Sequence, residues 1–263
     1  MNATDDALYY VDAGHTRIKT VVRAHAGWEV VAVHTAAEPE TFFLWLESMF
    51  ETEPNRRVVI CSVLPTLQKR DIPEVFSDKV HLISVWEIPR ERIGYQTPQS
   101  LGLDRYLSCL GAVGLGRGPA VVVDAGTACT VDWMEETGLF RGGVILPGLT
   151  MAFESLESIF PGVVRGFRQL PDVFPGQSTT DSLLWGTGGA WTGSLDYFLR
   201  RYETSMGSFR LYLTGGDAGW LSTHLPEPWS ERGRVRPWLM FDGMKRHLEE
   251  SGFSPVSGSG PRR

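Results

Sequence analysis

The short turn around Asp124 contains residues well suited to phosphate and cation chemistry. Residues 121–127 read Val-Val-Val-Asp-Ala-Gly-Thr, and an alternating pattern then resumes as far as Asp132. The β-branched residues predict a buried strand on each side of a tight turn, which Gly126 permits. A carboxylate, backbone amides and the hydroxyl of Thr127 at one turn suit a nucleotide phosphate and its cation.

The same turn occurs near the N-terminus, where residues 9–16 read Tyr-Tyr-Val-Asp-Ala-Gly-His-Thr. Its aspartate, Asp12, precedes Asp124 by nearly half of the chain. Matched acidic turns in two halves predict duplicated lobes that face a shared cleft. The alternative is that two ordinary hairpins share this short sequence by coincidence. Lys19 beside the first turn is a counter-charge for phosphate in the functional interpretation, and a solvated strand lysine in the structural one.

The composition indicates a globular protein. The 263 residues can bury a large core, and hydrophobic and charged contents of 42% and 21% are ordinary. The net charge of −6 argues against a general nucleic-acid binder. Three scattered cysteines without a CxxC motif predict neither a disulfide framework nor a zinc site and fit a cytoplasmic location. The acidic start and the lack of a long apolar segment argue against a signal peptide and a membrane span.

The first half of the chain predicts elements that could position these turns. Alternation over residues 7–33 predicts a three-strand meander, and the aromatic spacing of residues 40–50 predicts a helix. Strands are expected at residues 57–62 and 80–85, with a helix beginning near Pro65 between them. This succession implies an α/β lobe whose sheet is partly parallel.

Residues 88–105 lose apolar periodicity and accumulate prolines and glycines, which predicts an irregular and often functional connection. Asp104 then enters a small-residue helix, and its spacing alone favours an ordinary helix N-terminal acid over a catalytic group. Further strands are expected at residues 138–148 and 210–213, helices at 149–159, 181–202 and 237–250, and a disordered tail at 251–263.

Six segments, in order along the chain, resemble motifs of the type III pantothenate kinases, which belong to the superfamily of acetate and sugar kinases, heat-shock-70 proteins and actin. They are residues 12–19 and 124–132 (phosphate motifs), 94–95 with 102–105 (pantothenate and base motif), 142–148, 176–179 and 214–218. The resemblance implies an α/β fold of two duplicated ribonuclease-H-like (actin-like) lobes with a cleft between them. Residues 1–114 would form the N-terminal lobe and residues 115–250 the C-terminal lobe, which carries the second phosphate and adenosine motifs.

The resemblance also implies an activity, the ATP-dependent phosphorylation of pantothenate to 4'-phosphopantothenate, which is the first step of coenzyme A synthesis. Asp104 would be the general base that takes the proton from the substrate hydroxyl, and Arg105 would bind the substrate carboxylate through its guanidinium. ATP would be bound by Asp12, Ala13, Gly14, His15, Thr16, Arg17, Ile18, Lys19 and Thr127. Pantothenate would be bound by Tyr95, Gly102, Leu103, Asp104, Arg105 and Thr179.

The same resemblance implies ions and a partner. Asp12 would orient Mg²⁺ through water, and Asp124 would bind a monovalent cation, K⁺ or ammonium. Family members are homodimers with the pantothenate site near the subunit interface, so a cytoplasmic homodimer without nucleic-acid or membrane partners is expected.

Two positions depart from the family pattern. His15 stands where the family usually has Asn, which can alter nucleotide affinity or pH response. Gln177 stands where the family usually has Lys, and Arg165 or Arg168 could supply the missing charge.

Two other functions stay open. One is a superfamily kinase or phosphatase acting on another small molecule, which Tyr95 and the Gly-Leu-Asp-Arg segment argue against. The other is a catalytically silent nucleotide-binding regulator, which the presence of Asp12, Asp104 and Asp124 disfavours. The six histidines show no metal-ligand spacing, so a metalloenzyme has little support.

Overall fold

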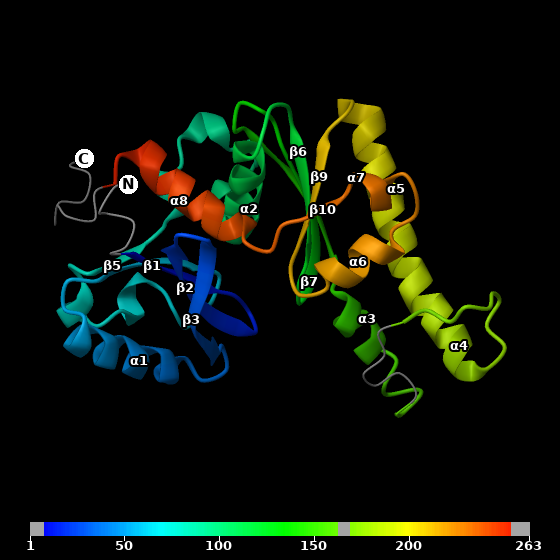
Figure 1. The fold of residues 1–263 in the computed structure, drawn as a ribbon, viewed down its shortest axis with the longest axis horizontal. Helices are drawn as coiled ribbons and strands as arrows, with labels where there is room; N and C mark the ends of the chain where they lie inside the picture. The colour runs from blue at the N-terminus through cyan, green and yellow to red at the C-terminus, as the bar shows by residue number, and fades with distance from the viewer. Residues whose placement is uncertain (1–7, 163–168, 254–263) are drawn as a thin grey trace. The chain divides into compact units, whose positions relative to one another are not determined.

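The computed structural model describes residues 8–162 and 169–253, drawn as a coloured ribbon in Figure 1. The chain divides into two compact units. Unit 1 comprises Met1–Gly114 and Met240–Arg263, and unit 2 comprises Leu115–Leu239.

The sheet of unit 1 has five strands in the order β3-β2-β1-β4-β5. The first three, β1, β2 and β3, are antiparallel, whereas β4 and β5 run parallel to β1. The meander and the partly parallel sheet were both expected from the sequence. Strand bounds are β1 Leu8–Ala13, β2 Arg17–Ala24, β3 Gly27–Thr35, β4 Arg57–Ser62 and β5 Val80–Leu82.

Helix α1 (Pro39–Thr52) packs on one face of this sheet, where its Phe42 and Leu46 join the buried cluster of Val11 and Ile18. Asp12 and Lys19 alternate with these core residues along β1 and β2, so their side chains belong to the opposite face of the sheet. The side chain of Asp12 therefore lies on the sheet face opposite to the one that α1 covers.

The helix expected near Pro65 does not form. Only two 3₁₀ turns, η2 (Lys69–Asp71) and η3 (Glu74–Phe76), occupy the connection between β4 and β5. The reason is Pro73, which cannot donate a backbone hydrogen bond and disfavours helical backbone at Ile72.

The connection after β5 is irregular, as predicted, and leads to the helix that contains Asp104. It contains three 3₁₀ turns, η4 (Val85–Glu87), η5 (Arg90–Arg92) and η6 (Pro98–Ser100). Helix α2 (Leu103–Gly114) follows, and Asp104 lies in its first turn.

Unit 2 repeats the topology of unit 1. Its sheet has the order β10-β9-β6-β7-β8, with β6, β7 and β8 antiparallel and with β9 and β10 parallel to this sheet's first strand, β6. The shared strand arrangement confirms the duplication predicted from the two acidic turns. Strand bounds are β6 Ala120–Ala125, β7 Ala128–Met134, β8 Phe140–Pro147, β9 Arg210–Thr214 and β10 Arg234–Val235.

Two helices of unit 2 differ from those predicted. The helix predicted over residues 149–159 ends at Glu154, and a five-residue π-helical segment, Trp185–Gly189, separates two α-helices where one was predicted. Three of the five residues of that segment are glycines, which lower helix propensity. Helix bounds are α3 Leu149–Glu154, α4 Thr179–Leu184, α5 Ala190–Met206, α6 Ala218–His224 and α7 Trp229–Arg232.

The last helix, α8 (Leu239–Ser251), belongs to unit 1 apart from its first residue, whereas the predicted division placed residues 115–250 in the second lobe. Gly243 of α8 lies against the Leu107 carbonyl of α2, which explains the assignment. Residues 254–263 of the predicted tail lie outside the described residues. Within the described part of the chain, no helix is long and apolar enough to cross a membrane.

Candidate active site

Asp12 lies near the end of β1 in unit 1, in a row of three residues that crosses the sheet. The register places Lys19 of β2 on one side of it and Cys61 of β4 on the other. Gly14 opens the turn that follows, where its N–H donates to the Arg17 carbonyl at 3.0 Å. The predicted phosphate segment therefore forms a hairpin turn that begins directly after the carboxylate.

Asp104 lies close enough to Asp12 to influence its ionisation. Burial, reinforced by the negative charge of Asp104 and opposed by the ammonium of Lys19, raises the pKa of Asp12 to about 7. A carboxylate held in such surroundings gains from a bound cation. Mg²⁺ typically takes one or two carboxylates together with waters and substrate phosphates, and Asp12 fits that role.

We expect Asp12→Asn to stabilise the metal-free protein at pH 8. The raised pKa means that the folded protein holds a proton that the unfolded chain loses near pH 4, so wild-type stability falls as pH rises from about 4 to 7. Asparagine carries no such charge. After allowance for solvent screening, the gain should be about 1–2 kcal/mol at pH 8 and smaller at pH 5. Denaturant unfolding in EDTA measures it, and an identical pH dependence in both proteins would contradict the expectation.

Asp104 occupies the first turn of α2, where the backbone N–H of Arg105 donates to its Oδ1 at 2.9 Å. Burial raises the pKa of Asp104, while that amide and the charges of Arg105 and His15 oppose the rise. His15, exposed in the turn between β1 and β2, therefore lies close enough to act on the proposed base. The departure from the family's Asn thus places an ionisable ring near Asp104.

Arg105 is buried, with 8% of its surface exposed, and its Cζ lies 5.9 Å from the centre of the Tyr95 ring. A guanidinium at this distance from an aromatic ring is held by a cation–π interaction. Gly102 makes the arrangement possible, because a Cβ there would lie 2.6 Å from Asp104 Oδ1 and 3.4 Å from Arg105 Cδ. The structure thus brings Tyr95, Gly102, Asp104 and Arg105 together within unit 1.

Asp124 is the equivalent of Asp12 in unit 2. The register places Thr130 of β7 on one side of it and Thr214 of β9 on the other. Gly215 has φ +89°, and a Cβ there would lie 2.5 Å from Asp124 Oδ1, so the turn after β9 requires glycine. Thr127 is exposed in the turn between β6 and β7.

The loop predicted to contact pantothenate leads into α4 of unit 2. Thr179 is the first residue of α4 and is exposed, and Ser178 caps the helix by accepting a hydrogen bond from the Asp181 N–H at 3.1 Å. Thr179 is thus in a different unit from the group around Asp104. Arg165 and Arg168, named as substitutes for the lysine replaced by Gln177, lie outside the described residues.

Three residues near the two aspartates received no role of their own from the sequence, although two of them, Thr130 and Asp132, lie within the phosphate motif 124–132. Cys61 is buried beside Asp12, and burial together with the charges of Asp104 and Asp12 raises its pKa well above the ordinary value. Thr130 lies beside Asp124, and Asp132 two residues later accepts a hydrogen bond from it. The two-residue spacing of Thr130 and Asp132 is a signal that could have placed both on one face of a strand.

Within residues 8–162 and 169–253, no three His, Cys, Asp or Glu side chains are grouped so that they could hold a metal ion by themselves. Cations at Asp12 or Asp124 would therefore need further ligands from water, backbone, hydroxyl or phosphate oxygens. Such mixed coordination is ordinary for Mg²⁺ at kinase sites.

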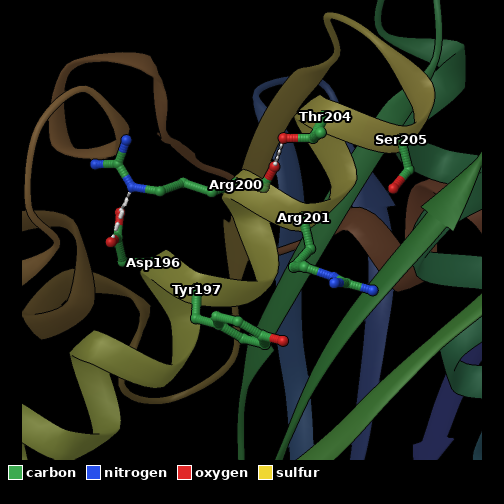
Figure 2. Close-up of a pocket in the computed structure, with 6 residues that line it drawn as sticks. All are labelled: Asp196, Tyr197, Arg200, Arg201, Thr204 and Ser205. Carbon is green, nitrogen blue, oxygen red and sulfur yellow. Dashed lines mark hydrogen bonds and ion pairs between the residues drawn. The ribbon is translucent and has the colours of Figure 1, made fainter.

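A hollow of about 390 Å³ lies along α5, as Figure 2 shows, and none of the residues that line it belongs to the predicted site. Arg200 in this hollow is paired with Asp196 at 2.8 Å, so its charge is already compensated. The lining residues come from one helix of unit 2: Asp196, Tyr197, Arg200, Arg201, Thr204 and Ser205.

Comparison with known proteins indicates the same family as the sequence motifs. The family described as type III pantothenate kinase matches residues 8–201 of this chain. The type III pantothenate kinase of Laribacter hongkongensis is 32% identical over 83% of this chain and 90% of its own length. That of Flavobacterium johnsoniae is 28% identical over 82% and 88%, respectively.

A solved structure of MreB 5 from Spiroplasma citri, bound to AMPPNP, superposes with a TM-score of 0.52. It covers 93% of this chain and 96% of its own, at 10% identity, and so is similar in fold alone. Together with the two matching five-stranded sheets, this likeness confirms the predicted actin-like α/β fold.

Proposed function

Because the chain belongs to the type III pantothenate kinase family, we infer that it transfers a phosphoryl group from ATP to pantothenate, the first step of coenzyme A synthesis. The observation that carries this inference beyond the family match is the group of Asp104, Arg105 and Tyr95 in unit 1. A half-buried carboxylate adjoins a buried guanidinium there, and a primary alcohol with a distant carboxylate needs both groups.

Asp104 is the proposed general base. Its raised pKa strengthens it as a proton acceptor, while the Arg105 amide and the charge of His15 keep the ionised form accessible. The carboxylate would accept the proton of the pantothenate hydroxyl as that oxygen attacks the γ-phosphorus of ATP. Phosphoryl transfer depends mainly on alignment and charge neutralisation, so the other residues act by binding and orienting.

Arg105 is the proposed partner of the pantothenate carboxylate. Its planar guanidinium matches a carboxylate with two parallel hydrogen bonds, and Tyr95 holds it through the ring contact. In unit 2, Thr179 at the start of α4 is the proposed further contact of pantothenate.

We expect Arg105→Lys to raise the KM for pantothenate by about tenfold or more, because lysine keeps the charge but loses the two-point contact. The KM for ATP should change little, and so should kcat. Steady-state kinetics with each substrate varied in turn measures both. Arg141→Lys is the matched control, because the exposed Arg141 on β8 also forms an ion pair, with Glu135. An unchanged KM for pantothenate in Arg105→Lys would remove Arg105 from the substrate site.

The two proposed cation sites lie at Asp12 and Asp124. Mg²⁺ when bound would neutralise phosphate charge, and Asp12 would hold it through water, while Gly14, Thr16, Lys19 and Thr127 bind phosphate oxygens. Asp124 is the proposed ligand of a monovalent cation, K⁺ or ammonium, and the hydroxyls on both sides of it fit such an ion. A homodimer is also proposed, on the family resemblance, and light scattering tests it.

The test is phosphate transfer from ATP with Mg²⁺, with and without K⁺ or ammonium, to pantothenate and to a panel of sugars and other alcohols. Transfer to pantothenate that depends on a monovalent cation supports the proposal. Transfer to another alcohol with pantothenate inactive would identify a different superfamily kinase. Nucleotide binding without transfer to any acceptor would favour the regulator.

A further inference from the structure

The two aspartates occupy equivalent places in the duplicated sheets, but their flanking residues differ in kind. In unit 1 the row across the sheet is Lys19, Asp12 and Cys61. In unit 2 the equivalent row is Thr130, Asp124 and Thr214. The residue on the antiparallel neighbour of each aspartate is thus an ammonium in one unit and a hydroxyl in the other.

The ammonium of Lys19 acts on its aspartate, since it opposes the rise in the pKa of Asp12. Position 130 carries no charge, so β7 presents an oxygen atom where β2 presents a fixed cation. Oxygen atoms of carboxylates, hydroxyls and carbonyls are the ligands of hard cations. Unit 1 supplies a cation to its aspartate through the ammonium of Lys19. The hydroxyl of Thr130 at the equivalent place in unit 2 suits a cation bound from solution instead.

The direction of one hydrogen bond supports this assignment. Thr130 Oγ1 donates to Asp132 Oδ2 at 2.7 Å, and Asp132 is 1% exposed. A hydroxyl has a single proton, so its oxygen then offers only lone pairs to any other neighbour. On the face that Thr130 shares with Asp124, it can therefore accept but not donate.

Asp132 is held in place by close packing. A Cβ on Gly143, its partner on β8, would lie 2.2 Å from Asp132 Oδ1. Only glycine leaves room there for the carboxylate, so the strand pair fixes the acceptor of the Thr130 proton.

We infer that Thr130 is a ligand of the monovalent cation at Asp124 and that Asp132 is a positioning residue that keeps the Thr130 oxygen free to accept. This inference rests on the proposed cation requirement and names further residues of the same site. Cations of the K⁺ class fit it, because within the row Asp124 is the single carboxylate and the residues on both sides of it, Thr130 and Thr214, are neutral hydroxyls.

The first test measures cation binding without turnover. Thermal unfolding in Mg-ADP is followed while KCl replaces tetramethylammonium chloride at constant ionic strength. For wild type and Thr130→Ser, K⁺ should raise the midpoint. For Thr130→Val, which keeps the shape and removes the oxygen, we expect the half-saturating K⁺ concentration to rise tenfold or more. Thr204→Val on the exposed face of α5 is the matched control and should behave as wild type.

The second test transfers the arrangement of unit 1 to unit 2. Thr130→Lys places an ammonium where Lys19 stands in the equivalent row, so this variant should show no K⁺-dependent rise in its midpoint. An unchanged K⁺ dependence in either Thr130→Val or Thr130→Lys would overturn the inference.

The inference and the proposed function fail differently. A wild-type protein that K⁺ stabilises but that does not phosphorylate pantothenate would contradict the function and leave Thr130 as a cation ligand. A wild-type protein that phosphorylates pantothenate but shows no K⁺ effect on the midpoint would contradict the inference alone.

Discussion

Asp104→Asn should lower kcat for pantothenate phosphorylation by on the order of 10³, since a positioned general base contributes about 10²–10⁴. The amide is nearly isosteric and its oxygen can still accept the Arg105 N–H, so α2 should keep its first turn. Asparagine cannot take the hydroxyl proton. The KM values for pantothenate and ATP should therefore change much less than kcat, and steady-state kinetics separates the two.

A stability measurement shows whether lost activity comes from lost structure. Burial raises the pKa of Asp104, so the ionised carboxylate destabilises the folded state above its unfolded pKa. Asp104→Asn should consequently be at least as stable as wild type at pH 8. Asp196→Asn, on α5 away from the motifs, is the matched control and should keep full activity. A kcat for Asp104→Asn within tenfold of wild type would exclude Asp104 as the base.

Gly243→Ala should destabilise the protein by roughly 3 kcal/mol and lower its melting temperature by about 10 °C. A Cβ at this position would lie 1.8 Å from the Leu107 carbonyl oxygen and 3.1 Å from the Gly111 nitrogen. Both contacts are with the backbone of α2, which cannot turn away as a flexible side chain can. The helices must separate, and the helix that carries Asp104 would shift with them.

The control for Gly243→Ala is a glycine in a helix with open space around it. A Cβ on Gly193 of α5 would meet nothing within 4 Å beyond its chain neighbours and the backbone of its own helix, so Gly193→Ala should stabilise the protein by about 0.5–1 kcal/mol through helix propensity. Denaturant unfolding measures both variants. Equal effects of the two substitutions would contradict the close packing of α8 on α2.

Local sequence was sufficient for the strands and turns that carry the aspartates. β-Branched alternation and the Asp-Ala-Gly repeat predicted the meanders around Asp12 and Asp124, and these depend on the conformations that each short segment favours. It failed at Pro65, where proline at a predicted helix start was outweighed by Pro73, and at residues 155–159, where the chain turns instead of continuing α3. Element lengths depend on packing that no short window contains.

Motif order predicted which residues belong to the site, but their neighbours depended on register. Lys19 follows Asp12 by seven residues and Thr130 follows Asp124 by six, because the first turn is one residue longer. Aligning the two halves by position would pair Lys19 with Val131, whose side chain belongs to the core.

Cross-strand register depends on turn length, and one residue of slip exchanges the two faces of a strand. The sequence by itself therefore determined the duplicated acidic turns and the family to which they belong. Only the tertiary structure decided that Cys61 and Thr214 flank the two aspartates, that α8 packs on α2, and that Thr130 is the counterpart of Lys19. Those relations join strands and helices that are distant in the chain, and the packing and hydrogen bonding of the folded sheets bring them together.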